Sequence, residues 1–444
     1  MGKSSFISSH LADVASPGTG LAIVDGPTKR RWRDSMLPMD DLPDAPSGTP
    51  FGMLSGIRVL DLTNSIAGPY ASQLLGDFGA DVVKVERPGS GDDARAWGPP
   101  FLDGESLWFI SVNRNKRSLT LDYTRPEGRA ILLDLARRAD VVLVNMIPRT
   151  QEKLGLTHEA LAAVKPDLVF AAITGFGLTG ERTDLPCYDL IAEGYSGVMD
   201  LTGEPDAPPQ KVGSPAADLL AGQDAALAVC AALFERARTG RGCRIDISLV
   251  ESMTRFMAPR LVPFLASGEL PRRSGGRDSV IAVYQTFETA DGPITLGLGN
   301  DGIWRRFCAA IERPGWAEDP RFAGNAKRRE ARPALVAAIQ EVLLGRTRAH
   351  WLAAFAKARV PAGPINRLDE VAADPELRAR GMVYAMRDGG RVRPQVNLGI
   401  QVDGAVPSPR LPPPRLGEHT AAILQELAGL AEKELAALRG AGII

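Results

Sequence analysis

A regular alternation of short apolar segments with amphipathic ones, beginning at Ile57, constrains the fold of this chain most strongly. The segments IRVLDL, DVVKVE, RSLTLD, VVLVN and LVFAAITGFG have the length and composition of buried strands, and the stretches between them have helical periodicity. Strands separated by single helices pair in parallel through right-handed crossovers. The sequence therefore predicts an α/β domain built on a parallel sheet.

The loops after these strands are where the sequence predicts chemistry. In an open parallel sheet, ligands bind beyond the carboxyl ends of the strands, where PGSGD, NMIPRT and GFGLTGERTD would lie. Arg87 and Arg95 flank the first loop and could face phosphate groups, although a solvated turn with surface arginines explains them equally well. Neither GxGxxG after a strand nor GxxxxGK[ST] occurs, so nicotinamide and P-loop chemistry have little support.

Changes in composition divide the chain into four segments. Residues 1–52 mix Pro, Gly, Ser and charged residues without apolar periodicity, which predicts a loose extension. Residues 53–263 are predicted to form the first part of the large domain. Residues 264–363 are richer in Arg, Trp and Phe and contain a hairpin pattern, which predicts a smaller α+β domain. Residues 364–444 are predicted to return to the large domain and to end in two amphipathic helices.

The charge balance and the cysteine and histidine patterns limit which partners, cellular location and metal or disulfide chemistry we expect. Lys and Arg number 52 against 53 Asp and Glu, so no overall field favours nucleic acid or a membrane surface. No signal-peptide or membrane-spanning pattern is apparent, which predicts a cytoplasmic protein. The four cysteines lie far apart without a CxxC pair, and neither HExxH nor HxH occurs, so we expect reduced thiols and no metal site.

A long helix is predicted from Ser214 to about Arg238, with Ser214 as the N-cap and Pro215 at the first helical position. Asp218 falls in its first turn, where the helix dipole would lower the pKa of the carboxyl group and keep it ionised. An ionised carboxylate in a cleft can act as a nucleophile. A first-turn acid is also a common partner of the helix dipole, so the residues alone leave both interpretations open.

Two further segments are candidates for the site. Asp189 precedes a helical stretch and is predicted to be its N-cap, with Tyr188 packed against the sheet. Cys187 is interpreted as structural, because no histidine close in sequence could lower its pKa. The segment SGGRDS, with Gly275 and Gly276, is either a linker or a mobile lid whose backbone N–H groups face a developing oxyanion.

Several longer motifs follow one another in a fixed order: GIRVLDLTNSIAGPYASQLLGDFGADVVKVERPGSGD, NRNKRSLTLD, ADVVLVNMIPRT, ITGFGLTGERTD, YDLIAEGYSGVMDLTG, RTGRGCRIDISLVES, VPAGPINRLDEVAADPELRARG and LGEHT. Over nearly all of residues 55–444 this set resembles family III CoA-transferases, the relatives of formyl-CoA:oxalate and carnitine CoA-transferases and of α-methylacyl-CoA racemases. The resemblance implies a Rossmann-like large domain that binds CoA, a thioester site at the boundary with the small domain, and an interlinked homodimer. It implies a CoA thioester as substrate and no permanently bound cofactor.

The resemblance also assigns residues by position. The family's nucleophile is an Asp at the start of a helix, and the matching residue in SPAADLLAG is Asp218. Tyr188 and Asp189 match positions that approach the thioester. Lys153 stands where the formyl-CoA enzyme has a phosphate-binding Arg and Pro186 stands where it has a Lys, so phosphate recognition is expected to differ. The positions that match CoA contacts are Ile66, Ala67, Arg87, Leu121, Asp122, Asn145, Met146, Ile147 and Lys153.

Tyr188 bears on which reaction to expect. Racemase relatives have a His at this position, which pairs with the Asp to exchange the α-proton of the substrate. A tyrosine with a pKa of about 10 is a poor base at pH 7, so the sequence favours CoA transfer to a carboxylic acid through acyl-aspartyl anhydride and aspartyl-CoA intermediates on Asp218. The alternatives are an acyl-CoA isomerase or racemase, including intramolecular CoA transfer, and a catalytically silent CoA-binding protein. A dicarboxylate acceptor or a solvated basic edge would explain Arg260, Arg272, Arg273 and Arg277.

Overall fold

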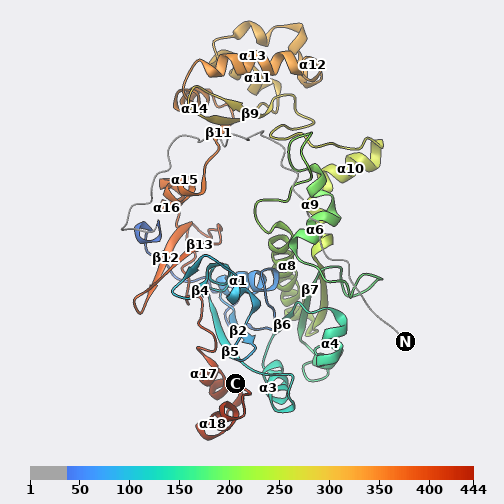
Figure 1. Cartoon of the computed structure of the whole chain (residues 1–444), viewed down its shortest axis with the longest axis vertical. Helices are drawn as coiled ribbons and strands as arrows, with labels where there is room; N and C mark the ends of the chain where they lie inside the picture. Colours follow the sequence, from blue (N-terminus) through green and yellow to red (C-terminus); the bar gives the residue numbers. More distant parts are fainter. Residues whose placement is uncertain (1–37) are drawn as a thin grey trace, which may run out of the picture. The chain divides into compact units, whose positions relative to one another are not determined.

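The computed structural model describes residues 38–444, and its largest sheet, drawn in the lower half of Figure 1, has six strands. All of its neighbouring strands run parallel, in the order β5-β2-β1-β6-β7-β8. This confirms the predicted α/β fold with a central parallel sheet. The strands are β1 (Arg58–Asp61), β2 (Asp81–Glu86), β5 (Lys116–Thr120), β6 (Val141–Val144), β7 (Val169–Thr174) and β8 (Cys243–Ser248).

Helices cover both faces of this sheet, because successive strand residues point to opposite sides. Val59 of β1 belongs to one hydrophobic core and Leu60 belongs to the other. The first core packs against α1 (Ala67–Asp77), α6 (Asp189–Ser196), α7 (Val198–Leu201), α8 (Ala216–Thr239) and α9 (Leu249–Phe256). The second packs against α3 (Pro126–Arg137), α4 (Pro148–Leu154), α5 (His158–Ala162), α17 (Thr420–Ala428) and α18 (Glu432–Gly440).

Helix α8 runs close against α1. At the crossing Gly222 has no side chain, and a Cβ there would lie 2.5 Å from the Ala67 carbonyl oxygen. Among residues 38–444, α8 alone is long and apolar enough to cross a membrane by length and composition. That is weak evidence, since the central helix of a folded core meets the same criteria. The α8 residues buried in the first core include Ala217, Ala221, Ala225 and Val229.

A second, antiparallel sheet forms with its own group of helices. It contains β9 (Tyr284–Glu288), β10 (Pro293–Gly297) and β11 (Ala362–Pro364), in the order β11-β10-β9. The predicted hairpin turn is present, and Asp291 in it accepts hydrogen bonds from the Arg348 backbone (2.6 Å) and the Thr289 hydroxyl (3.1 Å). A third hydrophobic core lies between this sheet and α11 (Asp301–Ala310), α13 (Arg332–Leu344) and α14 (Arg348–Lys357), with α12 (Gly324–Glu330) beside them.

The end of the chain returns to the central sheet. Thr420 at the start of α17 accepts a hydrogen bond from the Thr120 backbone (3.0 Å), and the Asp122 backbone donates to the Ile443 carbonyl (2.7 Å). The remaining α-helices are α2 (Leu107–Ser111), α10 (Ala258–Ser267), α15 (Leu368–Ala373) and α16 (Pro375–Ala379). Two further strand pairs are antiparallel, β3 (Phe101–Leu102) with β4 (Glu105–Ser106) and β12 (Val383–Asp388) with β13 (Arg391–Val396). Short 3₁₀ helices are η1 (Pro38–Asp41), η2 (Asp93–Ala96), η3 (Pro314–Ala317) and η4 (Pro320–Phe322).

Residues 38–52, which the sequence assigns to a loose extension, make specific contacts with the rest of the described chain. Ala45 donates a backbone hydrogen bond to Ala385 in β12 (3.1 Å), and the Ala385 N–H donates to the Pro43 carbonyl (2.8 Å). Phe51 is buried and stacks on Phe78 with ring centroids 5.9 Å apart. These residues therefore gain backbone pairing and apolar burial that composition could not reveal. The rest of the predicted extension lies outside the described residues.

Candidate active site

A cavity of about 310 Å³ lies at the carboxyl ends of β1, β6 and β7. The sequence predicts ligand binding at this edge of the sheet. Five of the predicted site residues meet here, namely Ala67, Asn145, Ile147, Tyr188 and Asp218. The rest of the lining consists of Asn64, Ser65, Ile173, Thr174, Gly175, Asp184, Leu185, Pro186, Cys187 and Leu249.

Asp218 brings a half-buried carboxyl group to this cavity from the first turn of α8. Within residues 38–444 no hydrogen bond or ion pair reaches its carboxylate oxygens. Burial, and then the nearby Asp189 carboxylate, raise its pKa from the ordinary 3.8 to about 7. The prediction that the helix dipole lowers this pKa is therefore wrong. Desolvation and a like charge outweigh the dipole here.

Asp189 caps the N-terminus of α8, a role that the sequence assigns to Ser214. Helix α8 begins at Ala216 with Pro215 as its N-cap, and no side chain of that segment caps it. The Asp189 carboxylate, which comes from α6, instead accepts the backbone N–H groups of Ala217 (2.8 Å) and Asp218 (3.3 Å). The positive end of α8 thus acts on Asp189. The predictions that Ser214 is the N-cap of α8 and that Asp189 is the N-cap of its own helix are therefore both wrong, because Pro215 and Tyr188 occupy those positions.

Tyr188 and Cys187 differ from each other in exposure and reactivity. Tyr188 is 63% exposed and is itself the N-cap of α6, so the prediction that it packs against the sheet is wrong. Burial, with Asp218 and Asp189 adding to it, raises the pKa of Cys187 to about 11, which makes a thiolate rare at pH 7. No three His, Cys, Asp or Glu side chains of residues 38–444 are grouped so that they could hold a metal ion.

Asn64 and Ser65 line the cavity from the loop after β1, and our sequence reasoning missed both. Ser65 has a left-handed backbone (φ 68°) beside the cavity, a conformation that often marks functional loops. Asn145 donates to the Asn64 carbonyl (2.8 Å) and accepts from its N–H (3.2 Å). The Ser65 hydroxyl donates to the Asn64 side-chain oxygen (3.2 Å), which leaves the Asn64 amide nitrogen without a partner among the described residues. Their position directly after a predicted strand was the available signal.

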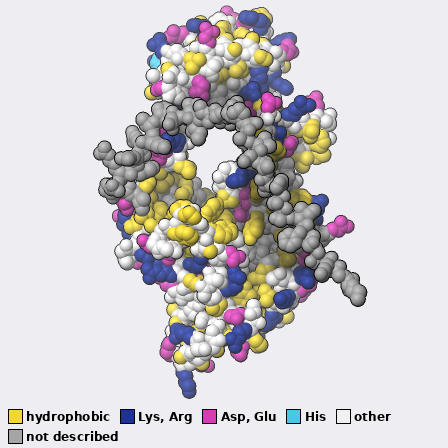
Figure 2. Space-filling model, viewed as in Figure 1, with side chains coloured by type: hydrophobic (Ala, Val, Ile, Leu, Met, Phe, Trp, Pro, Cys, Tyr) yellow, Lys and Arg dark blue, Asp and Glu magenta, His cyan; other side chains and the backbone are white. Residues whose placement is uncertain are grey.

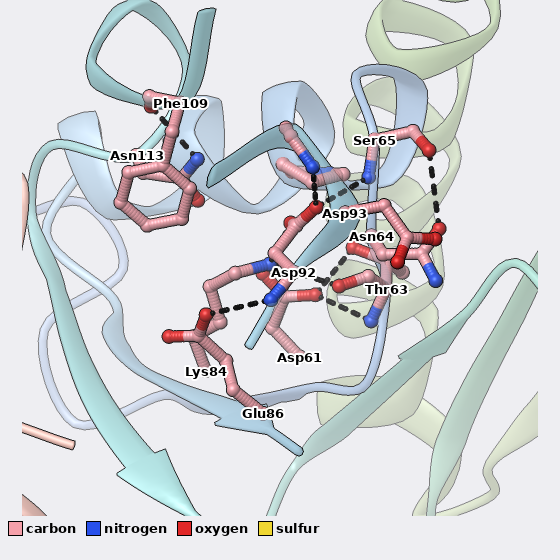
Figure 3. Close-up of polar contacts among 12 residues, drawn as sticks. Asp61, Thr63, Asn64, Ser65, Lys84, Glu86, Asp92, Asp93, Phe109 and Asn113 are labelled. Carbon is pink, nitrogen blue, oxygen red and sulfur yellow. Dashed lines mark hydrogen bonds and ion pairs between the residues drawn. The ribbon is translucent and has the colours of Figure 1, made fainter. Parts of the chain in front are cut away.

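A buried ion pair between Lys84 and Asp92 fixes the loop that contains Asn64 and Ser65 (Figure 3). Asp92 accepts the Ser65 N–H (2.9 Å) and lies 2.8 Å from the Lys84 ammonium, which also donates to the Thr63 carbonyl (2.8 Å). Both charged side chains are completely buried. Removing either partner would leave an uncompensated buried charge, which costs about 3–5 kcal/mol. The loop is therefore held in one conformation beside Asp218.

Two more buried charged residues, Lys116 and Asp61, lie next to the Lys84–Asp92 pair and beneath the first turn of α1. Lys116 donates to the Pro69 carbonyl (2.7 Å) and to Asn113 (2.7 Å), and lies 3.3 Å from Asp61. Burial, reinforced by Lys84, lowers the pKa of Lys116 to about 7. Burial also opposes ionisation of Asp61, but the two lysines and two hydroxyl donors outweigh it and hold the Asp61 pKa below its ordinary value.

The other predicted positions do not line the cavity. Arg87 is mostly exposed and pairs with Asp93, whereas Arg95 is occupied by Glu86 (2.7 Å) and stacks 3.6 Å above the Phe109 ring. Lys153 is exposed in the last turn of α4. The remaining predicted CoA contacts are Ile66 and Leu121, which are buried, Asp122, which bonds Thr124 (3.1 Å), and Met146, which packs in the second core.

Gly275 and Gly276 line a separate cavity of about 580 Å³ beside the antiparallel sheet, together with Arg277. Gly275 has φ +59° and donates to the Gly203 carbonyl (2.9 Å), and a Cβ there would lie 2.1 Å from the exposed Glu204 carboxylate, which would have to move. The glycine segment and Asp218 therefore do not share one cavity in this chain. Three of the four arginines singled out in the sequence carry ion pairs here, Arg260 with Asp278 (2.9 Å), Arg273 with Asp200 (3.5 Å) and Arg277 with Glu204 (3.8 Å).

Comparison with known proteins identifies the class. The family model "CoA-transferase family III" matches residues 54–420, so the chain belongs to this family. It is accordingly an enzyme that transfers CoA between carboxylic acids and uses CoA thioesters as substrates. The resemblance drawn from the sequence motifs is confirmed.

Individual relatives are similar in sequence to this chain over most of its length. A succinate–glutarate CoA-transferase of Agrobacterium fabrum is 41% identical over 385 residues, which cover 84% of this chain and 95% of that protein. An acetyl-CoA:oxalate CoA-transferase of Acetobacter aceti is 37% identical over 381 residues, 85% of this chain and 97% of that protein. The crystal structure of a CAIB/BAIF family protein from Brucella suis matches with a TM-score of 0.75 and 41% identity, covering 85% of this chain and 99% of that one.

Proposed function

We propose that this transferase moves CoA from an acyl-CoA donor to a dicarboxylic acid through covalent intermediates on Asp218. The carboxylate of Asp218 carries the proposal, because it lines the cavity at the sheet edge and no partner among residues 38–444 occupies it. A carboxyl group with a pKa of about 7 is ionised in a substantial fraction of molecules at neutral pH. It is also more basic than an ordinary carboxylate, which favours attack on a carbonyl carbon.

The proposed reaction needs four acyl transfers and no net proton. The Asp218 oxygen attacks the donor thioester carbon, the C–S bond breaks, and CoA thiolate leaves behind an acyl-aspartyl anhydride. The thiolate then attacks the aspartyl carbonyl, which releases the donor acid as a carboxylate and forms an aspartyl-CoA thioester. The acceptor carboxylate attacks that thioester and expels CoA thiolate. The thiolate finally attacks the acceptor carbonyl of the new anhydride, giving acceptor-CoA and regenerating the Asp218 carboxylate.

Each tetrahedral intermediate needs hydrogen-bond donors for its oxyanion. The N–H groups of Ala217 and Asp218 are already bound by Asp189, so they are not free for this task. We propose the Asn64 side-chain amide as one donor, because it lines the same cavity and has no other partner among the described residues. We propose Gly275 and Gly276 as a lid that excludes water from the anhydride, which requires the segment to move from the separate cavity that it lines here.

The proposal extends to CoA and to the acids. We propose that the thioester end lies in the cavity at Ala67, Asn145 and Ile147, and that the rest of CoA follows the loops toward Arg87 and Lys153. The positions assigned to it also include Ile66, Leu121, Asp122, Met146, Tyr188 and Asp189. A dicarboxylic acceptor is supported by the names of the relatives, which include succinate, glutarate and oxalate.

We further propose an interlinked homodimer that works in the cytoplasm, with residues 264–363 as the small domain. Hydrophobic side chains are exposed over α10 (Figure 2). More than half of the surface is accessible for Leu227, Phe234, Phe256, Val262 and Leu265 on α8, α9 and α10. Exposed apolar patches of this kind are typical of subunit interfaces. The third hydrophobic core, formed only by residues after Gly276, supports the proposed small domain.

Transfer from succinyl-CoA to a panel of acids tests the proposed function. We expect acceptor-CoA to form with glutarate, oxalate or another dicarboxylate, and to depend on the added acid, as measured by liquid chromatography and mass spectrometry. Acetate and propionate serve as monocarboxylate controls. Equal transfer to the monocarboxylates would contradict a dicarboxylate acceptor. Deuterium exchange at the acyl α-carbon in D₂O without any acceptor would instead support a racemase, and CoA binding without turnover a silent binder.

A further inference from the structure

Glu193 is a completely buried acid on α6, and one of its oxygens is unsatisfied. Its Oε2 accepts the Val212 N–H at 2.9 Å, whereas Oε1 is buried and has no hydrogen-bond partner. An unpaired charged oxygen in such a place is costly, so nearly all buried polar atoms find a partner. The resolution must come from the groups that Oε1 faces.

Asp189 is the candidate partner for this oxygen. It lies four residues before Glu193 on the same helix, so both side chains project from one face of α6. The Asp189 carboxylate lies close enough to Glu193 to raise the pKa of the Glu193 carboxyl group. Two carboxylates this close together cannot both be ionised, and one proton between them satisfies the otherwise unpaired Oε1.

Glu193 is thereby connected to the first turn of α8 in two ways. Asp189 holds the backbone N–H groups of Ala217 and Asp218, and Val212 lies in the loop that leads into α8. Both hydrogen bonds depend on where the Glu193 carboxyl group sits. Glu193 itself does not line the Asp218 cavity, so it does not contact substrate there.

We propose that Glu193 is protonated in the active enzyme, donates a hydrogen bond from Oε1 to Asp189, and so acts as a positioning residue for Asp218. This inference rests on the proposed role of Asp218 as the nucleophile. With the proton in place, Asp189 is held against the N-terminus of α8. Without it, two like charges repel and Asp189 is pushed away from the backbone that it fixes.

The surroundings favour the protonated form. Burial raises the pKa of Glu193, and Asp189 raises it further, while the Val212 N–H and Lys211 act in the opposite direction. The charged groups that face Glu193 are Asp189 on its own helix and Lys211 in the loop before α8, with Asp218 beyond Asp189. An acid with a raised pKa keeps its proton as the pH rises past its ordinary value and loses it at a higher pH. The positioning effect is therefore present at lower pH and lost on the alkaline side.

Glu193→Gln and Glu193→Ala test the role, with kcat and KM measured from pH 5.5 to 9.5. Glutamine offers a permanent N–H to Asp189 and an oxygen to Val212, so at neutral pH kcat should stay within about twofold of wild type. At alkaline pH wild type should lose kcat, and E193Q should not. E193A should lower kcat about 10- to 100-fold, the order expected when a nucleophile moves by about an ångström, with KM for acyl-CoA nearly unchanged.

The controls separate this inference from the proposed function. Glu341→Gln, at an exposed acid on α13, should leave kcat and its pH profile unchanged. The same alkaline loss in E193Q as in wild type, or full kcat in E193A, would overturn the positioning role. If E193A does not fold, the E193Q profile still decides. Failure of the proposed function is visible elsewhere, because Asp218→Ala would then stay active whatever the Glu193 variants do.

Discussion

Asp218→Asn should abolish transfer and make the protein more stable at neutral and alkaline pH. The carboxylate has no partner among residues 38–444 and lies near Asp189, so its ionised form is unfavourable in the folded state. A pKa raised from 3.8 to about 7 corresponds to roughly 4 kcal/mol, at about 1.4 kcal/mol for each pKa unit. The carboxyl group is partly exposed, and solvent screening reduces the expected gain to about 2–4 kcal/mol. Asparagine has nearly the same size and carries no charge.

The sign follows from proton linkage. A raised carboxyl pKa means that the folded protein binds the proton more tightly than the unfolded chain. This contribution to wild-type stability is present below about pH 4 and is lost as the pH rises to the folded pKa of about 7. The stability difference between D218N and wild type should therefore be small at the acidic end, grow through pH 5 and 6, and level off above pH 7.5.

Urea unfolding at several pH values, together with melting temperatures, measures this difference. Asp224→Asn is a matched control, because Asp224 lies on the same helix but is paired with Arg255. That variant should gain no stability as the pH rises. A D218N protein that is no more stable than wild type at pH 8, or that differs by the same amount at every pH, would refute the assigned electrostatics of Asp218.

Three further predictions concern the same site. Asp189→Asn keeps an oxygen that caps α8 but removes the like charge, so it should lower the pKa of Asp218. The acidic limb of the kcat/KM profile, expected near pH 7 in wild type, should then move to lower pH, and an unmoved limb would contradict this. Gly275→Ala should lower kcat more than the matched control Gly268→Ala, because both positions have positive φ (+59° and +72°) but only at Gly275 would a Cβ force a neighbouring side chain, Glu204, to move; equal effects would count against a glycine lid. Cys187, with a pKa of about 11, should resist iodoacetamide at pH 7.5 in the folded protein, and rapid alkylation seen by peptide mass spectrometry would show a thiolate.

Much of the fold followed from the sequence, because periodicity is a local property. The buried strands around Val59 and Val142 are short apolar runs between helical stretches, and they form the parallel sheet as predicted. The segment up to Phe51 was missed, since its pairing with β12 joins residues that are far apart in the chain. Composition cannot reveal such long-range pairing.

The electrostatics of the candidate site could not be predicted for a related reason. Asp189 reaches the backbone of Asp218 across 29 residues, and this contact replaces the local cap expected from Ser214. The raised pKa of Asp218 depends on burial and on that same neighbour, neither of which is local. The motif that resembles the family's nucleophile still placed Asp218 at the start of α8, where the structure has it.

Trapping with hydroxylamine tests covalent catalysis on Asp218 most directly. Hydroxylamine converts an activated aspartyl carbonyl to a hydroxamate, and intact-protein mass spectrometry after incubation with a panel of acyl-CoAs would detect the adduct. We predict one adduct that depends on a particular acyl-CoA, maps to Asp218 by peptide sequencing, and is absent from Asp218→Ala. Turnover without any adduct, or an adduct that persists in Asp218→Ala, would contradict the account.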